Sequence, residues 1–262
     1  MEYLIIVLVC FFSSAVGSVC GIGGGVIIKP VLDATGIMSV STGSFLSGVT
    51  VLSMSAVSLY RNLRKGTQAG FDRRFATVLA LGGVVGGMAG KELCQRMTEL
   101  LSSGERMGAV QGAVLTLVTA GTLVCTICKK RIPTGNIKNK AVVFGVGILL
   151  GMMSSFLGIG GGPINLVVLF CLFSMESKLA ALNSIYVILF SQISALLLAV
   201  VKGNVPPFEP ELLVLMSGCG VLGGLAGSRI NRRIGNEEVD KLFRGLMGVI
   251  ICISIYNVFR YM

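Results

Sequence analysis

The chain has 262 residues and a formal net charge of +10; 53% of its residues are hydrophobic and only 13% are charged. An average soluble domain has about 25% charged residues, so this composition, with a mean hydropathy of +0.86, excludes an ordinary soluble fold and predicts an all-α polytopic membrane protein. The basic residues gather between apolar segments and are not interleaved with aromatic residues. They therefore indicate loops that orient a membrane protein, and we expect no nucleic-acid partner.

The apolar segments fall into two kinds. Tyr3–Cys20 and Ala141–Leu157 are each followed by GIGGG and a short apolar piece, Val26–Leu32 or Pro163–Phe173. Glycine costs about 1 kcal/mol relative to alanine inside a helix, so each unit is predicted to be a helical hairpin that turns at the glycines and returns to its side of entry. The segments predicted to cross the roughly 30 Å hydrocarbon core are Phe45–Tyr60, Phe75–Leu93, Met107–Cys128, Leu179–Val201, Leu212–Ile230 and Leu242–Phe259.

The two halves of the chain repeat one another. The motif GIGGG begins at Gly21 and again at Gly158. The number of residues between these two glycines, here called the repeat spacing, also relates Gly86–Gly90 to Gly223–Gly227. Glycines four residues apart, as in these helices, are predicted to let helices pack closely in lipid. We predict a first membrane repeat at residues 1–128, a basic cytoplasmic linker at 129–140 and a second repeat at 141–262, together forming one transport domain.

The loop charges predict how the repeats are oriented. Arg61–Arg74 has five basic residues and one acid, and Lys129–Lys140 has five and none, so both are expected in the cytoplasm. The loop Lys91–Arg106 has three basic and three acidic residues. In the second half the bias reverses, because Val201–Glu211 has one lysine and two glutamates whereas Arg229–Arg244 has five basic residues. This predicts two inverted-topology repeats, each a re-entrant helical hairpin plus three transmembrane helices, with both termini outside.

The glycine breaks suggest an anion site. Hairpins entering from opposite sides can converge near the midplane, and a new helix is expected to begin at Val26 and at Pro163. The free N–H groups and dipole of a helix start favour an anion, and glycine lets the backbone approach it. The predicted substrate-binding residues are Gly21, Ile22, Gly23, Gly24, Gly25, Val26, Lys29, Ser47, Gly158, Ile159, Gly160, Gly161, Gly162, Pro163, Asn165, Asn183 and Ser184.

Side chains near the turns have two interpretations each. A lysine at the bilayer centre costs about 2.5–3.5 kcal/mol, which favours a functional, inward-facing Lys29, but a helix climbing to the surface would let Lys29 reach the headgroups. Ser47 and Ser184 are related by the repeat spacing and could complete an anion's shell or bond between helices. If backbone donors hold the anion, Gly24→Val and Gly161→Val are expected to abolish binding while folding survives.

The residues of the chain do not indicate an enzyme. The third glycine of G-x-G-x-x-G is replaced by Val26 and Pro163, and no βαβ pattern surrounds the motif. The chain has no histidine, so a serine nucleophile lacks its usual base. Cys125-x-x-Cys128 without a partner pair is interpreted as a helix end. We predict no enzyme activity, cofactor or metal, and we expect coupling to travel with the substrate's own charge or protonation state.

The twin GIGGG segments, each near the start of a hydrophobic half, resemble the TauE/SafE sulfite exporter family over essentially the whole chain. The resemblance implies a multi-pass transporter of the plasma membrane, which is the inner membrane of the bacterium. It also implies that both motifs line the transport pathway. It also implies a sulfur-containing anion such as sulfite, an organosulfonate, sulfoacetate or thiosulfate. The predicted partners are this small anion and the lipid bilayer, and a homo-oligomer is allowed. An anion-selective channel and a transporter of another small organic anion are the alternatives.

Overall fold

The regular structure of the described part of the chain is helical. A computed structural model describes residues 2–64, 71–101, 104–129, 134–137 and 139–261, so parts of the predicted loops Arg61–Arg74 and Lys129–Lys140 lie outside the described residues. The helices are α1 (Glu2–Cys20), α2 (Gly25–Thr35), α3 (Val40–Arg64), α4 (Arg73–Leu101), α5 (Gly104–Ile127), α6 (Lys140–Phe156), α7 (Pro163–Phe173), α8 (Ser177–Val201), α9 (Pro210–Arg233) and α10 (Asn236–Tyr261).

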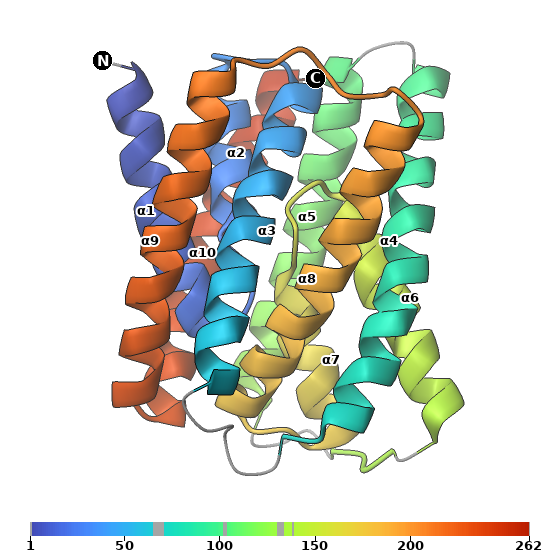
Figure 1. Ribbon diagram of the computed structural model, residues 1–262, viewed down its shortest axis with the longest axis vertical. Helices are drawn as coiled ribbons and strands as arrows, with labels where there is room; N and C mark the ends of the chain where they lie inside the picture. The colour runs from blue at the N-terminus through green and yellow to red at the C-terminus, as the bar shows by residue number, and fades with distance from the viewer. Residues whose placement is uncertain (1, 65–70, 102–103, 130–133, 138, 262) are drawn as a thin grey trace.

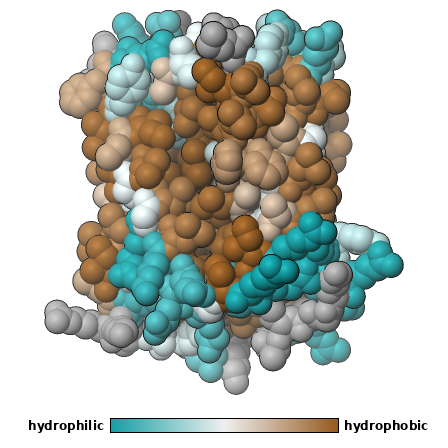
Figure 2. All heavy atoms as spheres, turned by 90° about the vertical axis from the view of Figure 1, so that its left-hand side faces the viewer, coloured by the Kyte–Doolittle hydropathy of each residue, from teal (hydrophilic) through white to brown (hydrophobic). Residues whose placement is uncertain are grey.

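The prediction of an all-α polytopic membrane protein is confirmed. Helices α1, α3, α4, α5, α8, α9 and α10 are long and apolar enough to cross a membrane, and α6 and α7 are shorter apolar helices. Figure 2 shows a broad hydrophobic band between two hydrophilic ends on the face that it displays. Helices α3, α4, α9 and α10 extend beyond the predicted apolar segments at both ends, because polar residues at their ends continue the helix. Helices α5 and α8 extend beyond them only at their starts, and α5 ends at Ile127, one residue before the predicted Cys128.

The order of helices is the same in both halves. Helices α2 and α7 both have 11 residues, and α3 and α8 both have 25. Figure 1 shows both termini at the upper end of the bundle, here called the terminal end, where the pair α1–α2 opens. The pair α6–α7 opens at the lower end, here called the linker end. The two hairpins therefore point toward each other from opposite ends, and their orientation in a membrane stays a prediction.

Glycine faces join the two halves. A Cβ atom built on Gly86 of α4 would lie 2.0 Å from the carbonyl oxygen of Ile148 on α6, and one built on Gly223 of α9 would lie 2.4 Å from that of Phe11 on α1. These two contacts are equivalent in the two halves, because the repeat spacing relates both pairs of residues. Only a hydrogen atom fits at such distances, so the packing role predicted for these glycines is confirmed.

Neighbouring helices fix the two short helices. On α10, Asn257 Nδ2 donates to the carbonyl oxygen of Pro30 at 2.8 Å, and Tyr261 Oη donates to that of Asp33 at 2.9 Å. At the linker end, Lys129 Nζ lies 4.7 Å from the centre of the Phe170 ring and donates to Asp240 Oδ2 at 2.8 Å. Helix α10 thus holds α2, while Lys129, two residues beyond the end of α5, contacts α7.

Candidate functional site

The two glycine turns have matching backbones. Gly21 and Gly23 have φ angles of 73° and 78°, and their counterparts Gly158 and Gly160 have 65° and 67°. Glycine enters this left-handed region without steric cost, so these positions stop α1 and α6 and reverse the chain. The helices that follow begin at Gly25 and at Pro163, within one residue of the predicted starts. The first N–H groups of each have no acceptor within their own helix.

The tips of the two hairpins meet, as the sequence predicts. A Cβ atom on Gly25 would lie 2.1 Å from the carbonyl oxygen of Ile159, and one on Gly161 would lie 2.4 Å from that of Ile22. Val51 of α3 packs against Gly160 from the side, since a Cβ there would lie 2.7 Å from Val51 Cγ1. The turns therefore pack backbone against backbone, and an anion can enter between Gly25 and Ile159 only if they separate.

The serine and asparagine side chains beside the contact between the two turns differ between the two halves of the protein. Ser47 Oγ is buried without a hydrogen-bond partner among the described residues, and it lies 2.8 Å from the Cβ position of Gly25. In the second half, Asn165 Nδ2 donates to Ser184 Oγ at 3.0 Å. The position equivalent to Asn165 is Ile28, so Ser47 cannot make the same bond and keeps a free hydroxyl beside the first turn.

Asn183 is directed away from the other predicted residues. Its Nδ2 donates to the carbonyl oxygen of Leu179 at 2.9 Å and contacts the sulfur of Met175 at 3.6 Å, both near the start of α8. Residues one position apart on a helix face different directions, so Ser184 faces α7 while the Asn183 amide bonds along its own helix.

Lys29 is buried inside the protein. Its side chain on α2 is 3% exposed, and Nζ lies 2.5 Å from Oδ2 of Asp33, whose side chain is 8% exposed. Lys29 Cε is 3.2 Å from the Cβ position of Gly158 in the second turn. The interpretation that Lys29 reaches the headgroups is therefore wrong, because α5, α10 and the second turn enclose α2 at this depth.

Three residues beside the Lys29–Asp33 ion pair were not among the residues predicted from the sequence. Gln111 of α5 and Ser254 and Asn257 of α10 line, with Lys29 and Asp33, a space of about 10 Å³, and each has a buried oxygen without a hydrogen-bond partner among the described residues. Such a volume holds about one water molecule. Gln111 is the sole amide within Met107–Cys128, a signal that could have identified it.

A vestibule connects this region with the terminal end. Its volume is about 470 Å³, and its lining includes Lys91, Ser44 and Gln111. Ser44 Oγ lies 2.7 Å from the Cβ position of Gly158, and Gln111 also borders the space beside Lys29. The vestibule thus extends from the surface to residues that contact the second turn.

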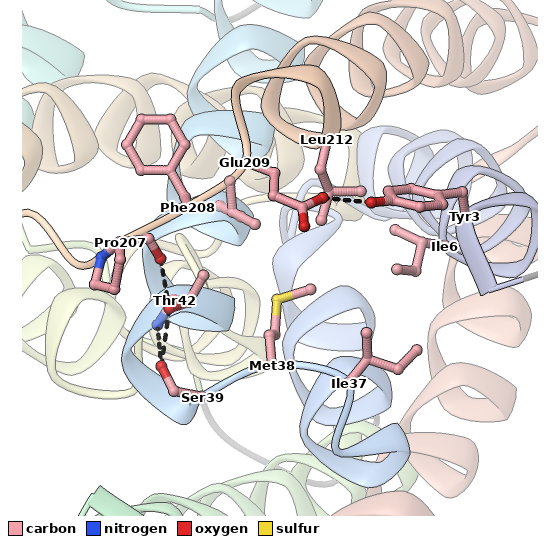
Figure 3. Close-up of a pocket in the computed structure, with 11 residues that line it drawn as sticks. Tyr3, Ile6, Ile37, Met38, Ser39, Thr42, Pro207, Phe208, Glu209 and Leu212 are labelled. Carbon is pink, nitrogen blue, oxygen red and sulfur yellow. Dashed lines mark hydrogen bonds between the residues drawn. The ribbon is translucent and has the colours of Figure 1, made fainter.

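A second cavity at the terminal end, of about 640 Å³, has a different floor (Figure 3). Glu209 and Tyr3 bond across its rim, while Ile6, Leu46 and Leu212 in its lining belong to an apolar cluster with Ile28 and Leu32. This second cavity therefore ends on packed apolar side chains, and the vestibule is the one that reaches polar groups at the turns.

The expectation that Gly24→Val and Gly161→Val fold normally is wrong on steric grounds. A Cβ on Gly24 would lie 2.8 Å from Cα of Ser14, and one on Gly161 would meet the Ile22 carbonyl oxygen as described above. Backbone atoms cannot yield as a flexible side chain does, so these variants test packing and binding together. Gly162 is different, because the nearest atom to its Cβ position is 3.7 Å away, in Ile164.

Comparison with known proteins agrees with this architecture. No solved structure matches the chain. The chain is 21% identical over 281 residues to the probable membrane transporter protein YunE of Bacillus subtilis (strain 168), with 98% of each protein covered. The model of the family described as sulfite exporter TauE/SafE matches residues 6–256, nearly the whole chain. The protein is therefore a multi-pass membrane transporter that belongs to the TauE/SafE family.

Proposed function

We propose that the protein carries a small sulfur-containing oxyanion by alternating access and binds it where the two glycine turns meet. The anion would be held by the N–H groups at the starts of α2 and α7, by the hydroxyl of Ser47 and by the ammonium of Lys29. The family description, sulfite exporter TauE/SafE, suggests sulfite or a related anion. The observation that carries the proposal is the burial of Lys29 against Gly158, which brings a cation of the first hairpin to the turn of the second.

The geometry supports a carrier cycle. The turns are in contact and the space beside Lys29 is about 10 Å³, which is enough for one water molecule and too little for an oxyanion. The vestibule of about 470 Å³ reaches this region from the terminal end, while at the linker end Lys129, Ser177 and Asp240 are bonded together. Anion entry would part the hairpins, and release to the other side would open the linker-end contacts.

Flux into proteoliposomes tests the transport proposal. A saturable, gradient-coupled flux of sulfite, thiosulfate or a sulfonate is expected from a carrier. Ohmic conductance would instead indicate a channel, and the absence of flux with all of these anions would overturn the proposal. A thermal-shift screen with the same anions and with sulfate and carboxylates identifies the ligand, because binding to the native state raises stability by RT ln(1 + [L]/Kd).

Gly162→Ala tests whether backbone N–H groups hold the anion. Gly162 has φ −159°, which any residue adopts, and a Cβ atom there would make only ordinary contacts, the nearest at 3.7 Å, so the thermal midpoint is expected to stay unchanged. A methyl group at the start of α7 would lengthen one charge-assisted hydrogen bond, worth about 1.5–3 kcal/mol, and raise Kd roughly tenfold to hundredfold. Gly145→Ala on α6, with nothing within 4 Å, is the control. Equal Kd values for both variants in isothermal titration would argue against backbone binding at α7.

Single-cysteine labelling in a cysteine-less background tests the membrane orientation. Reagents are expected to reach Val205→Cys at the terminal end only from outside, and Asp72→Cys and Glu237→Cys at the linker end only from the cytoplasm. All three positions are exposed. Labelling of Val205→Cys and Asp72→Cys from the same side would contradict the inverted repeat.

A further inference from the structure

We propose that Asp33 is the proton-binding residue of a transport cycle that moves one monovalent anion with one proton. In this cycle the anion and the Asp33 carboxylate compete for the ammonium of Lys29. The inference rests on the proposed function, since it requires an anion to bind beside Lys29.

The buried charges of the described part of the chain are confined to this pair. Lys29 is 2% and Asp33 6% exposed, and no other lysine, arginine, aspartate or glutamate of the described residues is buried to this degree. They lie one turn apart on α2 with Nζ and Oδ2 at 2.5 Å. Opposite charges in a low-dielectric interior stabilise one another, but either one alone is strongly destabilising. The pair is therefore stable as a neutral unit.

The surroundings of Asp33 leave its carboxylate dependent on Lys29. On α10, Tyr261 and Arg260 donate to backbone carbonyl oxygens of α2, those of Asp33 and Ala34. Residues 40–50 of α3, which pass the carboxylate at Gly43, contain no titratable group. Titratable groups near this end of the bundle include Glu105 and Arg106 at the start of α5 and Lys91 and Cys94 on α4. Among the helices packed against α2, α1 also carries Cys10 and Cys20, and α10 carries Cys252 and Tyr256. Lys29 is the side chain to which the Asp33 carboxylate is bonded.

Anion binding would change the partner of the Lys29 ammonium from the Asp33 carboxylate to the anion. When an oxyanion takes Lys29, the Asp33 carboxylate remains buried without a cation, which is costly. Uptake of one proton by a carboxylate oxygen removes that charge. The charges of Lys29 and Asp33 sum to zero before binding, and those of Lys29, a monoanion and a protonated Asp33 also sum to zero. No bond other than O–H forms or breaks, and the proton returns to water when the anion leaves.

Cavities at the terminal end lie close to the pair. The water-sized space beside Lys29 and Asp33 is bordered by Gln111, which also lines the vestibule. A further cavity of about 360 Å³ at the terminal end is lined by Glu105 and by Tyr261, whose hydroxyl donates to the backbone carbonyl oxygen of Asp33. In the proposed cycle, water in these cavities would supply the proton when the protein is open to the terminal end.

The charge balance also selects the substrate. A monoanion plus a proton leaves the buried site neutral, whereas a dianion would leave it with one negative charge. A sulfonate or hydrogen sulfite therefore fits better than thiosulfate or sulfate, and transport of a monoanion is electroneutral. This proposal differs from the expectation from the sequence, in which coupling travels with the substrate's own charge or protonation state.

The test uses anions of fixed charge, so that any proton coupling belongs to the protein. Methanesulfonate, a monoanion, and thiosulfate, a dianion, are measured in proteoliposomes under an imposed pH gradient with the membrane potential clamped. Wild-type protein is expected to accumulate methanesulfonate about tenfold per pH unit. Asp33→Asn is expected to lose this accumulation while keeping methanesulfonate exchange. Glu92→Gln is the control and is expected to keep this accumulation, because Glu92 lies in the second half of α4 and its carboxylate is bonded to Arg96 and Lys202.

A measurement on the wild-type protein does not depend on how the variant folds. Isothermal titration of methanesulfonate in two buffers of different ionisation enthalpy is expected to show uptake of one proton per bound anion. No proton uptake, or accumulation by Asp33→Asn that equals that of the wild type, would overturn the inference. Saturable thiosulfate flux without methanesulfonate flux would also overturn it while leaving the proposed function intact. Absence of flux with both anions and with sulfite would instead overturn the proposed function.

Discussion

Replacement of Lys29 by methionine is expected to abolish measurable anion binding and to lower the free energy of unfolding by about 3–5 kcal/mol. Methionine fills a similar volume, but it leaves the Asp33 carboxylate buried and unpaired at 6% exposure. The two effects have different causes, because binding is lost with the ammonium whereas stability is lost through the orphaned carboxylate. The thermal midpoint in detergent measures stability, and isothermal titration with the anion measures binding.

The double variant Lys29→Met/Asp33→Asn separates these causes. It removes both charges, so most of the stability is expected to return, while the affinity for the anion stays lost. Lys129→Met is the matched control, because Lys129 pairs with Asp240 at the linker end with side chains 23% and 26% exposed. Its effect on stability is expected to be about 1 kcal/mol or less. A Lys29→Met protein that folds and binds the anion with the wild-type Kd would place the site elsewhere.

The hairpins could be predicted because their signal is local. Gly21, Gly23, Gly158 and Gly160 adopt φ angles that glycine alone enters easily, and Pro163 begins α7 as its fixed φ favours. The repeat spacing then related the halves without any knowledge of their packing. The glycine turns and the helix start at Pro163 depend on a few adjacent residues, so they can be predicted from the sequence alone.

The surroundings of Lys29 could not be predicted in the same way. Whether Lys29 faces lipid or protein depends on α10, which crosses α2 and bonds to Pro30 and Asp33. Gln111 could be recognised as an unusual amide on an apolar helix, but its neighbours come from helices far away in the chain. The direction of the Asn183 side chain could not be predicted for a related reason, since one residue of helix rotation decides whether a side chain faces α7.

The role of the motif glycines also depends on their partners. The sequence indicates that Gly25 and Gly161 permit a close approach to the backbone, but it does not say what approaches. In the structure each meets a carbonyl oxygen of the other turn, those of Ile159 and Ile22. Glycine at these positions thus allows the hairpins to close on each other, whereas a Cβ atom on Gly162 would meet no atom closer than 3.7 Å.

Gly25→Ala is therefore expected to destabilise the closed arrangement of the hairpins. A methyl group would lie 2.1 Å from the Ile159 carbonyl oxygen, and backbone shifts of this kind cost about 1–3 kcal/mol or more. Gly25 is the first residue of α2 and has no positive φ, so alanine would otherwise favour the helix. A lower thermal midpoint can therefore be attributed to the close contacts of the methyl group with Ile159 and with Ser47 Oγ, which lies 2.8 Å from the Cβ position. If transport requires the turns to close, the flux should fall further than the affinity.

Gly162→Ala provides the matched comparison, since it adds the same methyl group beside the start of the other short helix, where the nearest atom is 3.7 Å distant. It should keep the thermal midpoint and lose affinity, whereas Gly25→Ala should lose the midpoint and slow the flux. Gly161→Ala, which would meet the Ile22 carbonyl oxygen at 2.4 Å, is expected to behave like Gly25→Ala. A Gly25→Ala protein with the wild-type midpoint would show that the two turns are held apart in solution, and the anion would then need no separation of the hairpins to enter.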